Sequence, residues 1–181
     1  MTTQEKNGIT EGVIWKQLLI FFFPILVGSF FQQLYNTVDS VIVGQFVGKE
    51  ALSSVGGSAG QIISLVVGFF TGVSTGATVI ISQYFGAGKK EEIEESLHTA
   101  YAFALVGGLV LGIAGIVFAP QMLLWMNTPE ELIAESVLYV RVYFSGLIFI
   151  FIYNMGAAIL RAVGDSKRPL YYLIVCSVVN I

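Results

Sequence analysis

The chain has 181 residues, of which 55% are hydrophobic and only 12% are charged, and its formal net charge is −3. Soluble domains carry about 25% charged residues, so this composition excludes an ordinary soluble protein and predicts an integral membrane protein embedded in the lipid bilayer. Neither the charge nor the aromatic residues suggest binding to nucleic acid. Cys176 is the single cysteine, which excludes an internal disulfide.

The apolar stretches predict an all-α, polytopic helix bundle with four complete transmembrane helices and part of a fifth. The expected helices cover residues of about 17–43, 52–83, 97–119, 132–161 and 170–181. The last stretch would span only about 18 Å at ~1.5 Å per residue, whereas the hydrocarbon core of a bilayer is about 30 Å thick. We therefore expect residues 1–181 to belong to a longer protein.

The first of these helices carries a polar stripe in an otherwise apolar run. Residues three, four and seven apart share one face of an α-helix, so Asp39 lies on the same face as three other polar residues, Gln32, Tyr35 and Asn36. A carboxylate at membrane depth costs about 2.5–3.5 kcal/mol. Two interpretations stay open: Asp39 pairs with a polar residue of another helix, or it belongs to a site that binds H⁺ or Na⁺ in exchange for a cationic substrate.

Other features of the helices concern packing and bending. Pro24 lies in the first third of the first helix, where it produces either a static kink or a bending point. Two later helices carry small residues on one face, which predicts close contact with a neighbouring helix. These residues are Gly60, Ser64, Gly68, Gly72 and Gly76 in the second helix, and Gly107, Gly108, Gly112 and Gly115 in the third.

Several kinds of chemistry have no counterpart in the sequence. A nucleotide-binding loop of the type GxxxxGK[ST] is absent. The single histidine, His98, is far from Cys176 in the sequence, so we expect no metal site. We therefore expect a protein without a cofactor and without enzymatic activity.

Basic residues are distributed unevenly between the two sides of the predicted membrane segments. Seven Lys and Arg residues fall on the side of the N-terminus: two up to Lys16, then Lys89, Lys90, Arg161, Lys167 and Arg168. The other side has Lys49 alone, if Arg141 is left out because it lies within the fourth helix. Cytoplasmic loops carry the excess of positive charge, so we expect a cytoplasmic N-terminus.

Three motifs resemble those of multidrug and toxic compound extrusion (MATE) transporters. In chain order they are Pro24 followed by Gln32, residues 35–40 (YNTVDS) and Gly44, then residues 83–88 (QYFGAG), then residues 160–169 (LRAVGDSKRP). The resemblance implies a protein of twelve helices in two lobes of six. Residues 1–181 would then form an incomplete N-terminal transmembrane lobe.

The resemblance also implies a function and a set of site residues. MATE transporters exchange H⁺ or Na⁺ for small organic compounds, often cationic. By this resemblance Asp39 is the coupling carboxylate, with Tyr139, Asn154 and Asn180 as its polar partners. The polar residues Gln32, Tyr35 and Asn36 would line the cavity, and Pro24 would allow bending. The implied protein resides in the plasma membrane, is monomeric at full length, and has a second acidic residue shortly after Ile181.

Two alternatives remain beside an antiporter. Flippases of lipid-linked saccharides belong to the same superfamily, but we expect basic residues in their cavities, whereas the stripe around Asp39 is acidic and polar. A non-transporting membrane scaffold or receptor is the other alternative, since the glycine faces could serve assembly.

Overall fold

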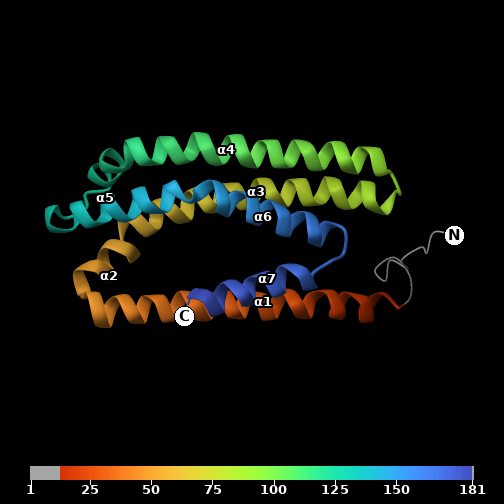
Figure 1. Cartoon of the computed structure of the whole chain (residues 1–181), viewed down its shortest axis with the longest axis horizontal. Helices are drawn as coiled ribbons and strands as arrows, with labels where there is room; N and C mark the ends of the chain where they lie inside the picture. The colour runs from red at the N-terminus through yellow and green to blue at the C-terminus, as the bar shows by residue number, and fades with distance from the viewer. Residues whose placement is uncertain (1–12, 181) are drawn as a thin grey trace.

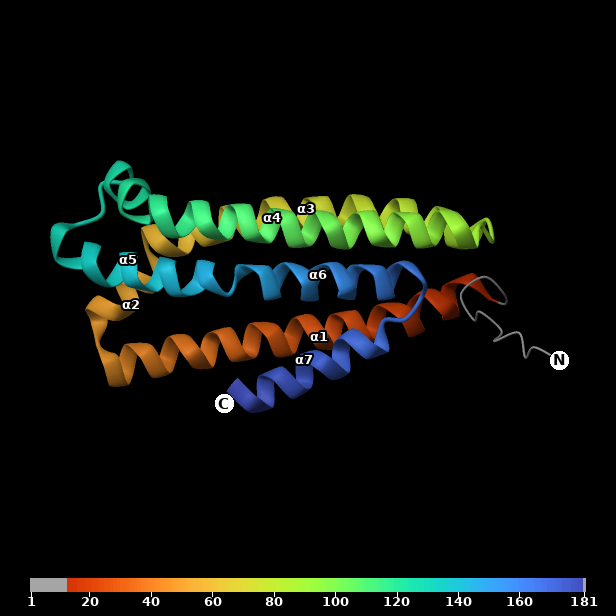
Figure 2. The same ribbon diagram turned by 45° about the horizontal axis from the view of Figure 1, so that its top comes forward.

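The computed structural model describes residues 13–180 and, within that range, every ordered element is helical. The elements are α1 (Ile14–Ile42), a π-helical turn η1 (Val43–Val47), α2 (Lys49–Gly56), α3 (Ser58–Gly86), α4 (Lys90–Trp125), α5 (Glu130–Ser145), α6 (Leu147–Ala162) and α7 (Lys167–Asn180). The long helices run side by side along one axis (Figure 1). Helices α3, α4, α5 and α6 form one group, while α1 packs against α7 and joins that group through α2 (Figure 2).

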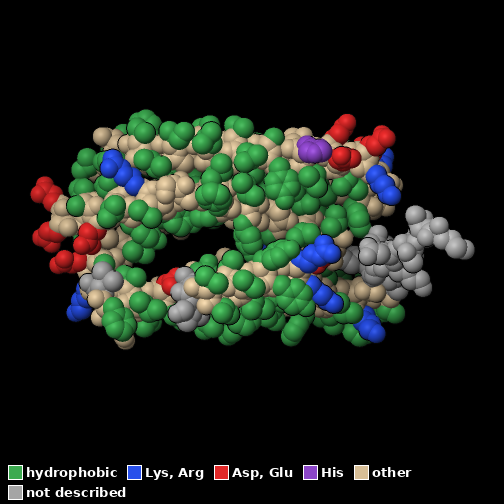
Figure 3. Space-filling model, in the orientation of Figure 1, with side chains coloured by type: hydrophobic (Ala, Val, Ile, Leu, Met, Phe, Trp, Pro, Cys, Tyr) green, Lys and Arg blue, Asp and Glu red, His purple; other side chains and the backbone are tan. Residues whose placement is uncertain are grey.

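Membrane-length helices dominate the structure. Three candidate spans, Ile14–Phe46, Lys49–Gly86 and Lys90–Trp125, are long and apolar enough to cross a bilayer, and the bent pair Glu130–Ser145 and Leu147–Ala162 could form a fourth. Large apolar side chains cover the outer surface (Figure 3), among them Leu65 at 73% exposure. Such a surface requires a hydrocarbon environment, so the predicted all-α membrane fold is confirmed.

Stacked aromatic rings lie in the core of the group formed by α3, α4, α5 and α6. The ring of Phe70 on α3 stacks on that of Phe151 on α6 at a centroid distance of 3.6 Å, and on Phe103 of α4 at 5.9 Å. Phe70 and Phe151 are both almost fully buried. These rings therefore fix α3, α4 and α6 relative to one another.

The predicted helix 52–83 is broken in the structure. Two helices, α2 and α3, replace it and meet at Gly57, whose ψ is −132°. A Cβ atom at Gly57 would lie 2.6 Å from the carbonyl oxygen of Ser53, so the break requires glycine there. Residues 44–50, between the first two predicted helices, are mostly helical, because only Gly48, at φ +119°, separates η1 from α2.

The predicted helix 132–161 is bent by 49° between α5 and α6, at Gly146. The glycine face of α4 lets this bend approach closely, as the glycine spacing predicts. A Cβ atom at Gly108 would lie 2.9 Å from the Cα of Ile148, and one at Gly115 would overlap the ring of Phe144. On α3 the predicted close contact is not observed at Gly68, Gly72 and Gly76, where a Cβ atom would meet no described atom within 4 Å.

The last predicted helix, residues 170–181, begins earlier, at Lys167. The reason is a cap, because Oδ1 of Asp165 accepts the backbone N–H groups of Lys167 and Arg168, both at 3.1 Å. Oδ2 of Asp165 also pairs with Nε of Arg168 at 3.1 Å. The acidic residue of the motif 160–169 therefore starts a helix.

The predicted helix 97–119 is longer in the structure and continues through Pro120 to Trp125. In an α-helix the N–H of residue 120 would donate to the carbonyl of residue 116, but proline has no N–H. Nε of Arg141 on α5 donates to that oxygen of Ile116 instead, at 3.2 Å. An arginine from the next helix thus satisfies the carbonyl that Pro120 leaves free, and it ties α5 to α4.

A double-mutant cycle tests this contact. Replacing Arg141→Met should destabilise the protein by about 0.6–1.7 kcal/mol, the range of hydrogen bonds between membrane helices. In a Pro120→Ala background the cost should be smaller, because the backbone N–H that this substitution restores can bond to the carbonyl of Ile116. Thermal unfolding in detergent measures both costs, and Arg161→Met at the exposed end of α6 is the control. Equal costs of Arg141→Met in the two backgrounds would contradict the contact.

Candidate functional site

An open pocket of about 650 Å³ lies where α1, α2, α3 and α5 meet. Figure 3 shows the hollow that separates the α1 and α7 pair from the other helices. The polar residues that line the pocket are Asn36, Asp39, Ser40, Gln61, Ser64 and Tyr139. Its apolar and small residues are Val43, Leu52, Val55, Gly56 and Gly60.

Helix α1 contributes one face to the pocket. Asn36, Asp39, Ser40 and Val43 follow one another at intervals of three, one and three residues, which is the spacing of a single helical face. The side chain of Asp39 is half-buried. The hydroxyl of Ser40 donates to the carbonyl of Asn36 at 2.8 Å, so the free polar groups of this wall are the carboxylate of Asp39 and the amide of Asn36.

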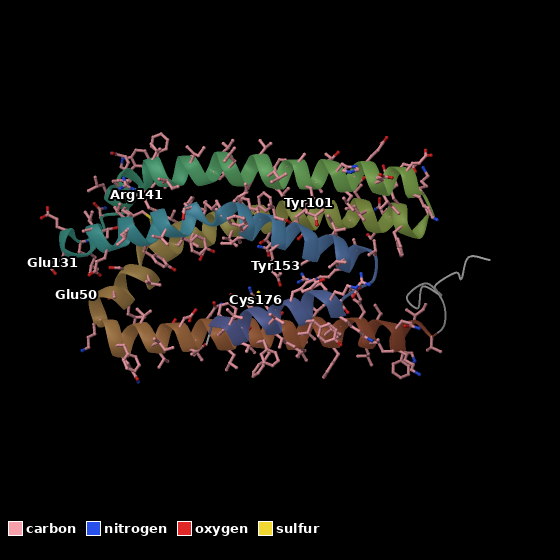
Figure 4. All side chains as sticks on the ribbon, viewed as in Figure 1. Glu50, Tyr101, Glu131, Arg141, Tyr153 and Cys176 are labelled. Atoms are coloured by element: carbon pink, nitrogen blue, oxygen red, sulfur yellow. The ribbon has the colours of Figure 1, made fainter. Side chains whose placement is uncertain are left out.

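Helix α5 places Tyr139 in the same pocket as Asp39, although 100 positions separate the two residues in the sequence. A contact between α2 and α5 supports this arrangement, since the hydroxyl of Ser54 donates to Oε2 of Glu135 at 3.4 Å. Glu135 precedes Tyr139 by four residues, which is about one helical turn. Figure 4 shows this end of the bundle, where Glu50 and Glu131 lie opposite the end at which α1 begins.

The other predicted site residues lie elsewhere or outside the described side chains. Gln32 and Tyr35 are not among the lining residues. Asn154 is half-buried on α6, where its Nδ2 donates to the carbonyl of Ile150 at 2.9 Å, and it does not line the pocket either. The side chain of Asn180 lies outside the part of the chain that the structure describes.

Pro24 is buried within α1 and shares a helical face with Gly28, four residues later. One turn further along α1, a Cβ atom at Gly28 would lie 3.6 Å from Leu170 and from Leu173. The proline therefore lies in the contact between α1 and α7, away from the pocket.

Helix α3 adds two polar residues that the sequence analysis did not assign to a site. Gln61 and Ser64 are three positions apart and line the pocket opposite α1. From the sequence, Ser64 is expected only as a small residue of a packing face. One feature of the sequence does single out Gln61, because it is the only amide side chain in the apolar run 58–82.

The carboxylate and the amides of the pocket differ from several hydroxyls of the membrane helices that find partners within their own helix. Ser29, Thr37, Thr71 and Thr75 each donate to a carbonyl four residues earlier in their own helix. Among the described residues, no such partner satisfies the carboxylate of Asp39 or the amides that line the pocket. Asp39 is half-buried, whereas Asn36 and Gln61 are exposed, so these polar atoms are available to a ligand.

The pocket suits a cation. Asp39 is the only charged side chain among the described lining residues, and the other polar atoms come from amides and hydroxyls. The described residues contain no cluster of three or more His, Cys, Asp or Glu side chains that could hold a metal ion.

Comparison with known proteins identifies relatives over the whole chain. The family model MatE matches residues 24–181. The probable multidrug resistance protein YoeA of Bacillus subtilis (strain 168) is 32% identical over 181 residues, which cover 100% of this chain and 38% of the relative. The probable multidrug resistance protein YpnP of the same organism is 33% identical over 174 residues, which cover 94% of this chain and 38% of the relative. The chain therefore spans about 38% of the length of these curated relatives.

Solved structures share the fold. A MOP superfamily transporter from Pyrococcus furiosus matches with a TM-score of 0.88 and 24% identity, covering 98% of this chain and 39% of the transporter. An outward-facing multidrug resistance MATE family transporter matches with a TM-score of 0.86 and 23% identity, covering 97% of this chain and 38% of that protein. The match of the family model shows that the chain belongs to the MatE family, the multidrug and toxic compound extrusion transporters. Together with the membrane-length helices of the chain, it identifies a multi-pass membrane protein.

Proposed function

We propose that the protein is a secondary active efflux transporter that exchanges H⁺ or Na⁺ for small organic compounds, often cationic, by alternating access. Membership of the MatE family and the names of the two multidrug resistance relatives support this function. The observation that carries it is the position of Asp39, the single charged side chain among the described residues that line the pocket of α1, α2, α3 and α5.

Exchange follows from competition for one carboxylate. A cationic substrate and the coupling ion both need the negative charge of Asp39, so the presence of one disfavours the other. Tyr139 and Asn36 line the same pocket and can offer oxygen atoms to either ligand. Asn154 and Asn180 remain proposed partners of this site from α6 and α7.

The polarity of the pocket favours a cationic substrate over the phosphate of a lipid-linked saccharide. No lysine or arginine occurs among the described lining residues. An anionic phosphate would therefore meet the charge of Asp39 without a compensating positive group. This composition supports an efflux transporter rather than a flippase.

Bending of α1 offers a way to move Asp39 during the cycle. Pro24 and Asp39 both lie on α1, fifteen residues apart, which corresponds to about 22 Å along the helix. The missing hydrogen bond at Pro24 makes this region of the helix easier to bend. We propose that a bend at Pro24 changes the access to the pocket.

Charge placement supports an orientation in the plasma membrane with a cytoplasmic N-terminus. The start of α1, the turn between α3 and α4 and the turn between α6 and α7 lie at the same end of the bundle (Figure 1). Lys16, Lys89, Lys90, Arg161 and Lys167 all belong to that end, which should therefore face the cytoplasm.

Replacement of Asp39 tests the proposed exchange. Asp39→Asn keeps the size of the side chain but removes its charge, so the efflux of a fluorescent organic cation from cells that express the complete protein should fall about tenfold or more, equivalent to about 1.4 kcal/mol of lost stabilisation. Glu94→Gln, an exposed carboxylate at the start of α4, is the matched control and should leave efflux unchanged. Equal efflux by Asp39→Asn and wild type at equal membrane expression would refute the role of Asp39.

Cysteine labelling tests the orientation. In a Cys176→Ser background, Glu131→Cys should react with a membrane-impermeant maleimide added to intact cells, because the exposed start of α5 lies at the outer end of the bundle. Glu94→Cys, at the opposite end, should react only after the cells are permeabilised. The reverse labelling pattern would place the N-terminus outside the cell.

A further inference from the structure

We infer that the pocket selects organic cations that carry N–H donors over quaternary cations, and that Gln61 is the residue that determines this selection. The inference rests on the proposed function, in which a cationic substrate binds at Asp39. The proposed selection therefore depends on a residue of α3, in addition to Asp39 of α1 and Tyr139 of α5.

The first argument is the kind of side chain around the charge. Quaternary ammonium ions have no N–H group, and proteins recognise them with several aromatic faces arranged as a cage. Tyr139 is the only aromatic residue among the described residues that line the pocket. The remaining polar lining consists of carboxylate, amide and hydroxyl groups, which recognise a cation by accepting its hydrogen bonds.

The second argument is the position of the acceptors. Asp39 and Asn36 lie on the wall formed by α1, whereas Gln61 and Ser64 lie on the wall formed by α3. A protonated amine has up to three N–H donors, and in this pocket it meets acceptors that two helices supply, among them Asp39 and the amide oxygen of Gln61. The volume of about 650 Å³ is within the range of sites for drug-sized ligands, so the rest of the molecule also has room.

The third argument is what happens when the ligand cannot donate. A quaternary cation keeps its attraction to Asp39 but displaces water from Gln61 without replacing its hydrogen bond. Sites built to bond an N–H group discriminate strongly against analogues that lack it. Ser64 adds a hydroxyl one turn further along α3, whereas the hydroxyl of Ser40 already donates within α1.

A matched pair of ligands tests the inference. One is 1-naphthylmethylamine, which is a primary ammonium ion at neutral pH, and the other is its trimethylammonium analogue, with the same ring and charge but no N–H. We expect the wild-type complete protein, purified in detergent, to bind the amine about tenfold more tightly than the analogue. Gln61→Leu should bring the two dissociation constants within about threefold by weakening the amine alone, while Gln61→Glu, which keeps an acceptor, should retain the preference.

The controls separate this inference from the proposed function. Gln83→Leu makes the same substitution on α3 outside the pocket and should keep the wild-type ratio. Unchanged binding of the quaternary ion by Gln61→Leu would show that this variant is folded. Equal affinity of the wild type for both ligands, or an unchanged ratio in Gln61→Leu, would overturn the role of Gln61 but leave cation binding intact. Failure of the wild type to bind either ligand would count against the proposed function as well.

Discussion

A carboxylate inside a membrane helix imposes the constraint on which the rest of this structure depends. Facing hydrocarbon, Asp39 would cost about 2.5–3.5 kcal/mol, so its helix must turn it toward a polar space. The structure provides that space in a pocket that α1 shares with α2, α3 and α5. Among the described residues, the other polar side chains that line the pocket carry amide and hydroxyl groups and none is a lysine or arginine, so the charge of Asp39 remains available to a ligand.

Local irregularities of the helices maintain this pocket. The break at Gly57 separates α2 from α3, and α2 is held against α5 by the hydrogen bond from Ser54 to Glu135. On the other side of the bundle, the glycine face of α4 accommodates the bend at Gly146. Arg141 satisfies the carbonyl of Ile116 that Pro120 leaves free. Packing and capping thus hold α5, and with it Tyr139, beside the pocket.

The sequence predicts those features that follow from local periodicity. The spacing of Asn36 and Asp39 places them on one helical face, and both line the pocket. The breaks at Gly57 and Gly146 are not predictable in this way, because single glycines are common in straight membrane helices, and each bend depends on contacts with another helix. The amide of Gln61 stands out in its apolar run, but the proposed role of this residue depends on the pocket that it shares with Asp39. That pocket arises from the packing of α1 and α3, which no local pattern indicates.

Competition between the substrate and the coupling ion tests the central claim that one pocket holds either of them. The affinity of the wild-type complete protein for 1-naphthylmethylamine can be measured at rising concentrations of Na⁺ and, separately, of H⁺, over a pH range in which the amine stays protonated. We predict that one of the two ions raises the apparent dissociation constant in proportion to its concentration, as expected for exclusive binding at Asp39. An affinity that neither ion changes would contradict a shared site.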